Sequence, residues 1–411
     1  MSPVHAKSRW RGVRLARRAV SEAAVAVAAV WRSGLGRTRF VGVTGSCAKT
    51  TTKDLAAAVL ATRLRGRSNR GTSNSLRTVI KTVLATRRSD DYCLQELGAG
   101  GPNSLDRSIA LLRPHVGVVT NVGLDHYKAF RSREAVAAEK RKLVHALPEG
   151  GFAILNADDP HVLPMREGCR ARVLTFGLAE GALVRGVDVR GAWPERLSLT
   201  LLHEGRAAPV ATRLCGTHWA PAVLAALAVG VAFDVPLEEA VAAIERVEPA
   251  PGRMRPVLRD DGVTFVCDDW KAPLWSVPPL LEFMRAARAS RKVLVVGTIS
   301  DFPGDNHRSY ARVARQALEV ADHVWFVGRW SRGALKARRE GTGEGPRAFP
   351  ALPEAAAALR ELLEPGDFVV LKGSGTVDGL GRLVDLSRRG AEVSRGQASH
   401  GAGDDAPAQV V

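Results

Sequence analysis

The feature that most constrains the fold is a phosphate-binding pattern placed between a short apolar run and a helix-forming stretch. Residues 40–44 are apolar enough for a buried strand, and residues 50–63 suit the helix that follows. The junction between them has the sequence Gly42-Val43-Thr44-Gly45-Ser46-Cys47-Ala48-Lys49-Thr50-Thr51-Thr52. At such a junction backbone N–H groups face an anion, a lysine reaches the outer phosphates, and the next hydroxyl can ligate Mg²⁺. We therefore predict a triphosphate site, with Ala48 in place of the glycine that usually precedes the lysine.

The alternation of strands and helices continues along the chain and predicts an α/β fold with mostly parallel sheets. Further strands are expected at residues 92–97, 115–121, 152–155, 197–202 and 211–214, with a helix at 221–233. After a turn-forming Pro-Ala-Pro-Gly at 249–252, more strands are expected at 264–267, 292–296, 323–327 and 368–371. We expect a central P-loop ATPase domain at 38–250, a smaller Rossmann-like domain at 251–389 and a disordered tail at 390–411. The hinge is expected at Pro251-Gly252.

A basic segment at residues 1–37 precedes the first domain. Residues 1–40 contain nine Lys or Arg and one Glu, and they place apolar side chains at helical spacing. These side chains are Trp10, Val13, Val20, Ala24, Val27 and Trp31. One interpretation is peripheral contact with an anionic membrane or a partner through residues 1–36. The other, which the sequence favours, is a solvated lead-in that packs one face on the domain.

The composition of the chain limits its possible partners and its cellular setting. The balance of 59 Lys and Arg against 42 Asp and Glu gives +17, which favours anionic partners. Aromatic residues make up 5% and no run interleaves them with basic residues, so nucleic acid is not expected. Five dispersed cysteines without a CxxC pair indicate a reduced, cytoplasmic setting. The longest apolar run near the N-terminus, residues 23–31, is too short to span a bilayer.

Two residues of types that can ligate a metal lie at or after the ends of other predicted strands. Glu96 precedes the Gly-rich turn at 97–101, and His126 closes the run that follows the strand at 115–121. The carboxyl ends of parallel strands share one edge of a sheet, so both residues are expected beside the phosphates. A carboxylate is a hard ligand for Mg²⁺, and a neutral imidazole can also ligate a metal. For each residue, a hydrogen-bonded surface role remains the alternative.

Together these motifs resemble the Mur ligase family, and within it the branch that adds D-alanyl-D-alanine. The resemblance covers residues 38–388 and is carried by nine motifs. They are VGVTGSCAKTTTKD (41–54), QELGAGGPN (95–103), RPHVGVVTNVGLDH (113–126), AVAAEKRKL (135–143), AILNADDP (153–160), GTH (216–218), APGRMRP (250–256), CDDWKAP (267–273) and VVLKGSGT (369–376). The resemblance implies ATP and Mg²⁺ as cofactors. It also implies a reaction in which a phosphorylated carboxylate, an acyl phosphate, is captured by an amine, with release of ADP and phosphate.

The resemblance also implies roles for residues of the first domain. Lys49 and Thr50 would hold the β- and γ-phosphates and Mg²⁺, in an ATP site that also includes Gly45, Ser46, Cys47, Ala48 and Thr51. Glu96 and His126 would ligate metal, and Lys49, Lys140 and His126 would also be catalytic. Lys140 matches the lysine that the family carbamylates, which would give an anion able to support a second Mg²⁺. From its neighbours alone, Arg141 and Lys142, Lys140 would be a solvated helix residue.

In the second domain the resemblance makes Arg253 and Asp269 nucleotide contacts and places the catalytic Lys271 near the reacting phosphate. Lys372 and Ser374 would belong to the amine site. In the first domain, a loop expected to face the carboxylate would hydrogen-bond it through Thr72, Ser73 and Asn74.

Three departures from the family bear on the substrates. The segment before Gly42 is too short for the family's UDP-sugar domain, so the standard UDP-muramoyl peptide is not expected as substrate. Trp219 and Ala222 occupy the positions of two adenine-contacting Asn residues, and Trp270-Lys271-Ala272-Pro273 replaces a Ser-Tyr-Asn-Ala-Asn run.

The leading hypothesis is therefore an ATP-dependent ligase that joins a small or carrier-linked carboxylate to an amino acid or peptide amine. One alternative is a polymer-forming ligase of the poly-γ-glutamate or cyanophycin type. Another is a nucleotide-binding subunit that requires a partner protein. A P-loop kinase or motor ATPase finds no support in the second domain.

Overall fold

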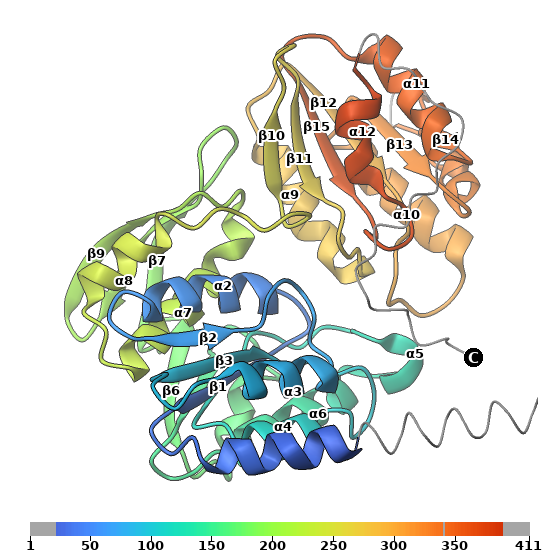
Figure 1. Cartoon of the computed structure of the whole chain (residues 1–411). Coiled ribbons are helices and arrows are strands. Elements are labelled where there is room, and N and C mark those ends of the chain that lie inside the picture. Colours follow the sequence, from blue (N-terminus) through green and yellow to red (C-terminus); the bar gives the residue numbers. More distant parts are fainter. Residues whose placement is uncertain (1–21, 340–341, 389–411) are drawn as a thin grey trace, which may run out of the picture.

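The computed structural model describes residues 22–339 and 342–388, which form two α/β units, each built on its own sheet (Figure 1). The larger unit holds nine strands in the order β2-β3-β1-β4-β5-β6-β7-β8-β9. Neighbours from β2 to β7 pair in parallel, whereas β8 and β9 extend the sheet in antiparallel fashion. The strands are β1 (Arg39–Thr44), β2 (Gly66–Ser68), β3 (Tyr92–Glu96), β4 (Val116–Val119), β5 (Phe152–Asn156), β6 (Arg172–Gly177), β7 (Val184–Arg190), β8 (Ser198–His203) and β9 (Arg206–Ala211).

Helices cover both faces of this sheet, because its strands carry apolar side chains on both. In β1, Val41 and Val43 belong to the core under α2 and α7, whereas Phe40 belongs to the core under α3, α4 and α6. The helices are α2 (Lys49–Leu60), α3 (Leu76–Ala85), α4 (Asp106–Leu112), α5 (Tyr127–Phe130), α6 (Arg133–His145), α7 (Ala220–Ala232) and α8 (Leu237–Ile244), with short 3-10 turns at η1 (Leu163–Arg166) and η2 (Thr217–Trp219). Helix α7 is apolar all round and almost wholly buried, as such a composition requires.

The smaller unit has six strands in the order β10-β11-β15-β12-β13-β14, all parallel except β10, which pairs antiparallel to β11. Its strands are β10 (Arg255–Leu258), β11 (Thr264–Asp268), β12 (Arg291–Val296), β13 (His323–Val327), β14 (Arg347–Phe349) and β15 (Asp367–Lys372). Its helices are α9 (Val277–Ala286), α10 (Asn306–Leu318), α11 (Leu352–Leu362) and α12 (Leu383–Leu386), with 3-10 turns at η3 (Leu274–Ser276), η4 (Ser331–Lys336) and η5 (Leu380–Arg382).

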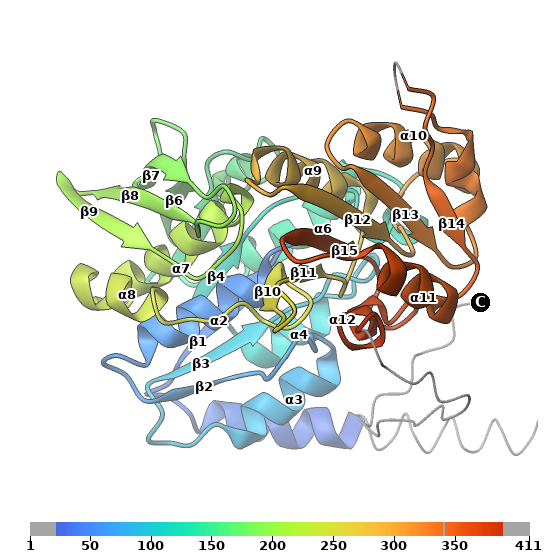
Figure 2. The same ribbon diagram turned by 90° about the horizontal axis from the view of Figure 1, so that it is seen from above.

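An apolar interface joins the two units, which lie against each other in both views (Figures 1 and 2). The rings of Trp193, from the larger unit, and Phe368, from β15, are stacked with centroids 5.3 Å apart. The backbone N–H of Arg288 donates to the carbonyl of Trp193 at 2.8 Å. This contact is continuous with the core under α2 and α7, so the units are packed together and not merely tethered.

The predicted fold class is confirmed, because both sheets are mostly parallel and carry helices. The strand predicted at residues 211–214 was wrong: β9 ends at Ala211, where the chain leaves the sheet for η2. Pro209 is compatible with β9 because β9 is an edge strand. The helix predicted at 50–63 ends three residues early, at Leu60.

Residues 22–33 are helical, but the face that packs on the core is not the predicted face that contains Val27 and Trp31. Ala28 is fully buried against the core under α3, α4 and α6, whereas Val27 is 60% exposed and Trp31 37% exposed. Trp10, Val13, Val20 and the predicted tail at 390–411 lie outside the described residues. Among the helices that are described, none is long and apolar enough to span a bilayer.

Candidate active site

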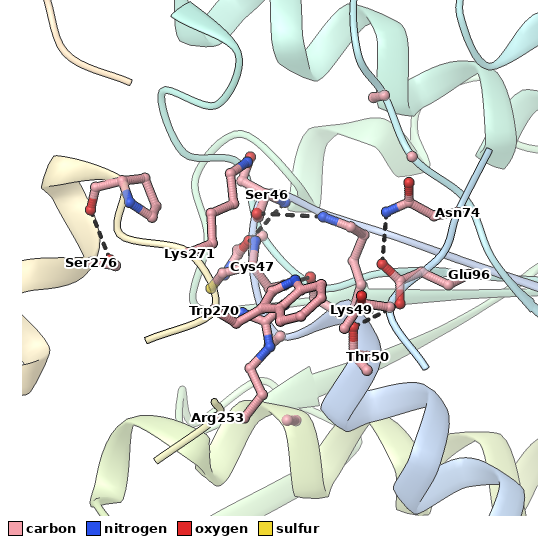
Figure 3. Close-up of a pocket in the computed structure, with 18 of the residues that line it drawn as sticks. Ser46, Cys47, Lys49, Thr50, Asn74, Glu96, Arg253, Trp270, Lys271 and Ser276 are labelled. Atoms are coloured by element: carbon pink, nitrogen blue, oxygen red, sulfur yellow. Dashed lines mark hydrogen bonds between the residues drawn. The ribbon is translucent and has the colours of Figure 1, made fainter. Parts of the chain in front are cut away.

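A cavity of about 570 Å³ lies between the two units, where strands β1, β3 and β4 of the large sheet end. Figure 3 shows residues of the loop after β1 facing Arg253, Trp270 and Lys271 from the smaller unit. The cavity therefore combines the predicted phosphate loop with side chains that come from more than 200 positions later in the sequence.

The phosphate loop is held in shape by Asn121, which follows β4. Its Oδ1 accepts the backbone N–H groups of Ser46 at 3.0 Å and Cys47 at 2.9 Å, and its Nδ2 donates to Cys47 Sγ at 2.8 Å. The ammonium of Lys49 donates to the carbonyl of Gly45 at 2.6 Å, so the lysine closes back over the loop. Ala48 has φ 63°, a left-handed conformation that costs an alanine about 1 kcal/mol or more.

Glu96 joins the phosphate loop to the neighbouring loop of the larger unit. Its Oε2 accepts from the hydroxyl of Thr50 at 2.8 Å, and its Oε1 accepts from the amide of Asn74 at 2.9 Å. Both bonds are visible in Figure 3. Glu96 is only 2% exposed, and these two hydrogen bonds hold its carboxyl group beside the N-terminus of α2. Three predicted site residues thus form one connected cluster of oxygen and amide groups.

A second charged group lies next to the loop and centres on Lys140, in α6. Lys140 is fully buried and its Nζ has no hydrogen-bond partner among the described residues. Burial first, and then the charge of Lys49, lower the pKa of Lys140 to about 7. Burial alone would raise the pKa of Asp125, but Lys49 and Lys271 hold it at about 2. The pKa of His126 is lowered by burial.

The smaller unit contributes cations to the same cavity. Lys271 lies 2.6 Å from Asp125, and Lys372, at the end of β15, donates to Asp268 at 2.6 Å. Arg253 lines the cavity and its Nε is buried without a partner among the residues described. The side of the cavity formed by the smaller unit is thus basic, with Lys271 and Lys372 paired to carboxylates and the Nε of Arg253 without a partner among the described residues.

The cavity brings together most of the residues predicted for the site. They are Ser46, Cys47, Ala48, Lys49, Thr50, Thr72, Asn74, Glu96, His126, Arg253, Lys271 and Lys372. Of the others, Gly45 and Thr51 lie in the loop and helix just behind it, and Lys140 is buried beside it. Ser73 does not face the cavity but bonds Thr78 through its hydroxyl.

Two predicted residues of the smaller unit lie elsewhere. Asp269 accepts the backbone N–H of Gly381 at 2.7 Å and lines a different hollow, while the preceding Asp268 reaches the cavity. Ser374 is absent from the lining, and its backbone N–H donates to Asp378 at 2.7 Å. The structure therefore does not bring the side chains of Asp269 and Ser374 to the other site residues.

Sequence reasoning missed several residues that shape the site. Asp125 stands next to His126 at the end of a predicted strand, and this position was a usable signal. Asn121 lies in the same run, but nothing in the sequence indicates that its amide holds a loop 74 residues earlier. Trp275 packs so closely on Gly123 that a Cβ there would lie 2.5 Å from its ring.

Comparison with known proteins agrees with the family resemblance of the sequence motifs. The family profile of the Mur ligase middle domain matches residues 43–230, and that of the Mur ligase glutamate ligase domain matches residues 252–375. The UDP-N-acetylmuramoyl-tripeptide–D-alanyl-D-alanine ligase of Mycobacterium leprae is 32% identical over 398 residues, covering 90% of this chain and 76% of that protein. The protein of the same name from Escherichia coli is 27% identical, covering 74% of this chain and 68% of its own length.

Two solved structures share the fold. MurF from Acinetobacter baumannii aligns with a TM-score of 0.81 at 24% identity, covering 89% of this chain and 80% of that one. MurF ligase from Thermotoga maritima, solved in complex with ADP, aligns with a TM-score of 0.76 at 21% identity, covering 88% and 83%.

Proposed function

The chain belongs to the Mur ligase family of ATP-dependent, amide-bond-forming ligases, and we propose that its reaction takes place in the cavity between its two units. It couples a carboxylate to an amine through an acyl phosphate and releases ADP and phosphate. The observation that carries this location is the cluster in which Thr50 and Asn74 both bond Glu96, beside Lys49. This cluster supplies a cation for phosphates and oxygen ligands for a metal ion.

The nucleotide phosphates would lie on the loop of residues 45–51 and the N-terminus of α2. Lys49 supplies positive charge, and the helix N-terminus favours anions. Arg253 supports this placement, because its unpartnered buried Nε lines the same cavity. Asp269 was predicted as a further contact, but Asp268 is the better placed of the two for any contact from β11.

The residues fit a Mg²⁺ ion bound together with phosphate. Thr50 and Glu96 would hold it, with His126 at the same sheet edge. No cluster of three His, Cys, Asp or Glu side chains forms a metal site by itself in the described part of the chain, which suits an ion that shares its ligands with a nucleotide. When bound, the ion would neutralise charge on the phosphates.

Lys140 fits the modification that the family resemblance implies. A buried amine with a pKa near 7 is largely neutral at slightly alkaline pH, and the neutral amine is the form that adds CO₂. Its Nζ has no partner among the residues described, so the resulting carbamate would not displace an existing bond. The added negative charge would lie beside the cations Lys49 and Lys271.

The substrates are proposed by class. The carboxylate would lie near Thr72 and Asn74, and the amine on the side of Lys372 and Lys271. Relatives are named for joining UDP-N-acetylmuramoyl-tripeptide to D-alanyl-D-alanine. The aromatic side chains of Trp270 and Trp275 in the lining favour a less polar substrate in this chain. ATP and free cysteines suit a cytoplasmic location.

The test is ADP release from the purified chain, offered ATP, Mg²⁺ and mixtures of carboxylic acids and amines. We expect release in some mixtures, and a loss on the order of a thousandfold in Lys49→Ala, because a phosphate contact is gone. Lys81→Ala, an exposed lysine on α3, is the matched control. Equal activity in Lys49→Ala would refute the site. ATP binding without turnover in any mixture would instead favour a subunit that needs a partner protein, and serial additions to one product would favour a polymer-forming ligase.

A further inference from the structure

The helix at residues 22–33 presents an apolar face to solvent as well as one to the core. Residues 23–31 are all apolar. One side of the helix packs against the core under α3, α4 and α6 through Ala24, Val25, Ala28 and Ala29. The other side is exposed and consists of Ala23, Ala26, Val27, Val30 and Trp31, which we name the outward stripe. A helix that is apolar on all sides is normally buried on all sides.

The outward stripe contains three large apolar side chains that are exposed to solvent. Val30 is 76% exposed, and Val27 and Trp31 are exposed as well. The indole N–H of Trp31 donates to the carbonyl of Thr86 at 2.9 Å, which fixes the ring against the end of α3. Leu84, two residues before Thr86, is 41% exposed. The helix that carries the stripe is therefore attached to the end of α3 through Trp31 and to the core through its other side.

Cations flank the stripe on both sides. On the side of α3, the guanidinium of Arg88 lies 5.9 Å from the centre of the Trp31 ring. On the side of α4, Arg113 donates to the carbonyl of Ala29 and to the hydroxyl of Ser33. The one acid of the helix, Glu22, is already paired with Arg107. The surface around the stripe is thus positively charged.

We propose that the outward stripe docks on an anionic lipid surface, with its apolar side chains in the headgroup layer and the flanking arginines against lipid phosphates. This is the arrangement of an amphipathic helix that lies in a membrane interface. The helix lies at the end of the larger unit that faces away from the smaller unit (Figure 1). Docking there would leave the contact between the two units, and the cavity, uncovered.

Charge disfavours the other possible occupants. Residues 1–21 contain six Lys or Arg and no acid, so folding back onto the stripe would bring like charges beside Arg88 and Arg113. A second copy paired through the same stripe would bring the same arginines together. An anionic bilayer instead matches both the cations beside the stripe and those that precede it in the sequence.

The test is flotation of the full chain with vesicles of phosphatidylcholine alone and with added phosphatidylglycerol. We expect binding only to the anionic vesicles, weakened by salt. The double variant Val27→Glu/Val30→Glu should bind at least about tenfold more weakly, because two exposed valines that would enter the headgroup layer are replaced by acids. Leu183→Glu/Leu258→Glu, which changes two exposed leucines elsewhere, is the matched control and should bind like the native chain. ATP binding and circular dichroism report whether each variant is folded.

Three outcomes would overturn the proposal. One is equal binding to neutral and anionic vesicles, and another is equal binding by Val27→Glu/Val30→Glu and its control. The third is a dimer of the native chain in size-exclusion chromatography that Val27→Glu/Val30→Glu converts to a monomer, which would make a second copy the occupant. None of these measurements depends on which substrates the enzyme joins, so they separate this proposal from the proposed reaction.

Discussion

The ammonium of Lys271, in the smaller unit, lies 2.6 Å from Oδ1 of Asp125, in the larger unit, and this ion pair joins the two units beside the phosphate loop. Asp125 is 3% exposed, so its charge depends on its cations. Asp301 extends the contact, since it lies 3.8 Å from Lys271 and accepts the backbone N–H of Tyr127. The relative position of the units is therefore coupled to the charges around the phosphate loop.

Lys271→Ala should lower kcat by about ten- to a hundredfold with little change in the Kd for ATP. The substitution removes a cation beside the proposed phosphate site and leaves Asp125 dependent on Lys49. Steady-state kinetics and nucleotide titration measure the two effects separately. A cycle with Asp125→Asn should show that the losses are not additive. An unchanged kcat in Lys271→Ala would place this lysine outside the reaction.

Lys140 should make both activity and stability depend on pH and CO₂. Its pKa is lowered from 10.5 to about 7, so the unfolded chain binds a proton between these values that the folded chain does not. The free energy of unfolding should therefore rise with pH from about 7 toward 10.5, by more than in Lys140→Met. Urea titrations at several pH values measure this difference. An identical pH slope in the two proteins would show that the lysine is not buried as described.

The same lysine gives a prediction for activity. Removing dissolved CO₂ should reduce turnover, and adding back the same concentration of dissolved CO₂ should restore it faster at pH 8 than at pH 6, because more of the amine is neutral. Lys140→Ala should lose activity and regain part of it with short carboxylic acids that fill the space of a carbamate. Full activity in Lys140→Ala, or no response to CO₂, would mean that the lysine is unmodified.

The sequence predicts which strand ends meet, but not the fine register at those ends. Glu96 and His126 were expected at one sheet edge because they follow apolar runs of a parallel sheet, and both line the cavity. Asp269 was expected there and Asp268 is found instead, since neighbouring residues at a strand end point in different directions. Such a choice depends on where β11 ends, which propensity does not fix to one residue.

Contacts between the units were beyond sequence reasoning for a different reason. Trp275 meets Gly123, and Trp193 meets Phe368, across separations of more than 150 residues. Local periodicity shows that each of these residues is apolar or small, yet it does not show which distant surface it packs against. The phosphate loop is defined by one short continuous motif, so it could be located in the sequence without knowledge of the rest of the fold.

The left-handed backbone of Ala48 predicts that Ala48→Gly is tolerated and stabilises the chain by up to about 1 kcal/mol. Relief of the strained alanine exceeds the extra entropy of glycine in the unfolded chain. Thermal unfolding and ATP titration measure the outcome. Gly45→Ala is the opposite case, because its Cβ would lie 1.8 Å from Thr120 Oγ1, and it should lose nucleotide binding. If Ala48→Gly lowered the stability of the chain, the left-handed backbone at Ala48 would not be a source of strain.

Trp219 should contribute to binding the base of the nucleotide and not its phosphates. It is 7% exposed, it lines the cavity, and its indole N–H is buried without a partner among the described residues. A buried donor of this kind gains when a ligand acceptor reaches it. Trp219→Phe keeps an aromatic ring and removes the donor, so the Kd for ATP should rise about three- to tenfold.

Inorganic tripolyphosphate provides the control for Trp219→Phe, since it carries the charge of the nucleotide chain without a base. Its affinity should be unchanged in Trp219→Phe and strongly reduced in Lys49→Ala. Isothermal titration of both ligands against the three proteins separates the two contributions. If Trp219→Phe weakened tripolyphosphate as much as ATP, the tryptophan would be acting on the shape of the loop, and the base would have to lie elsewhere in the cavity.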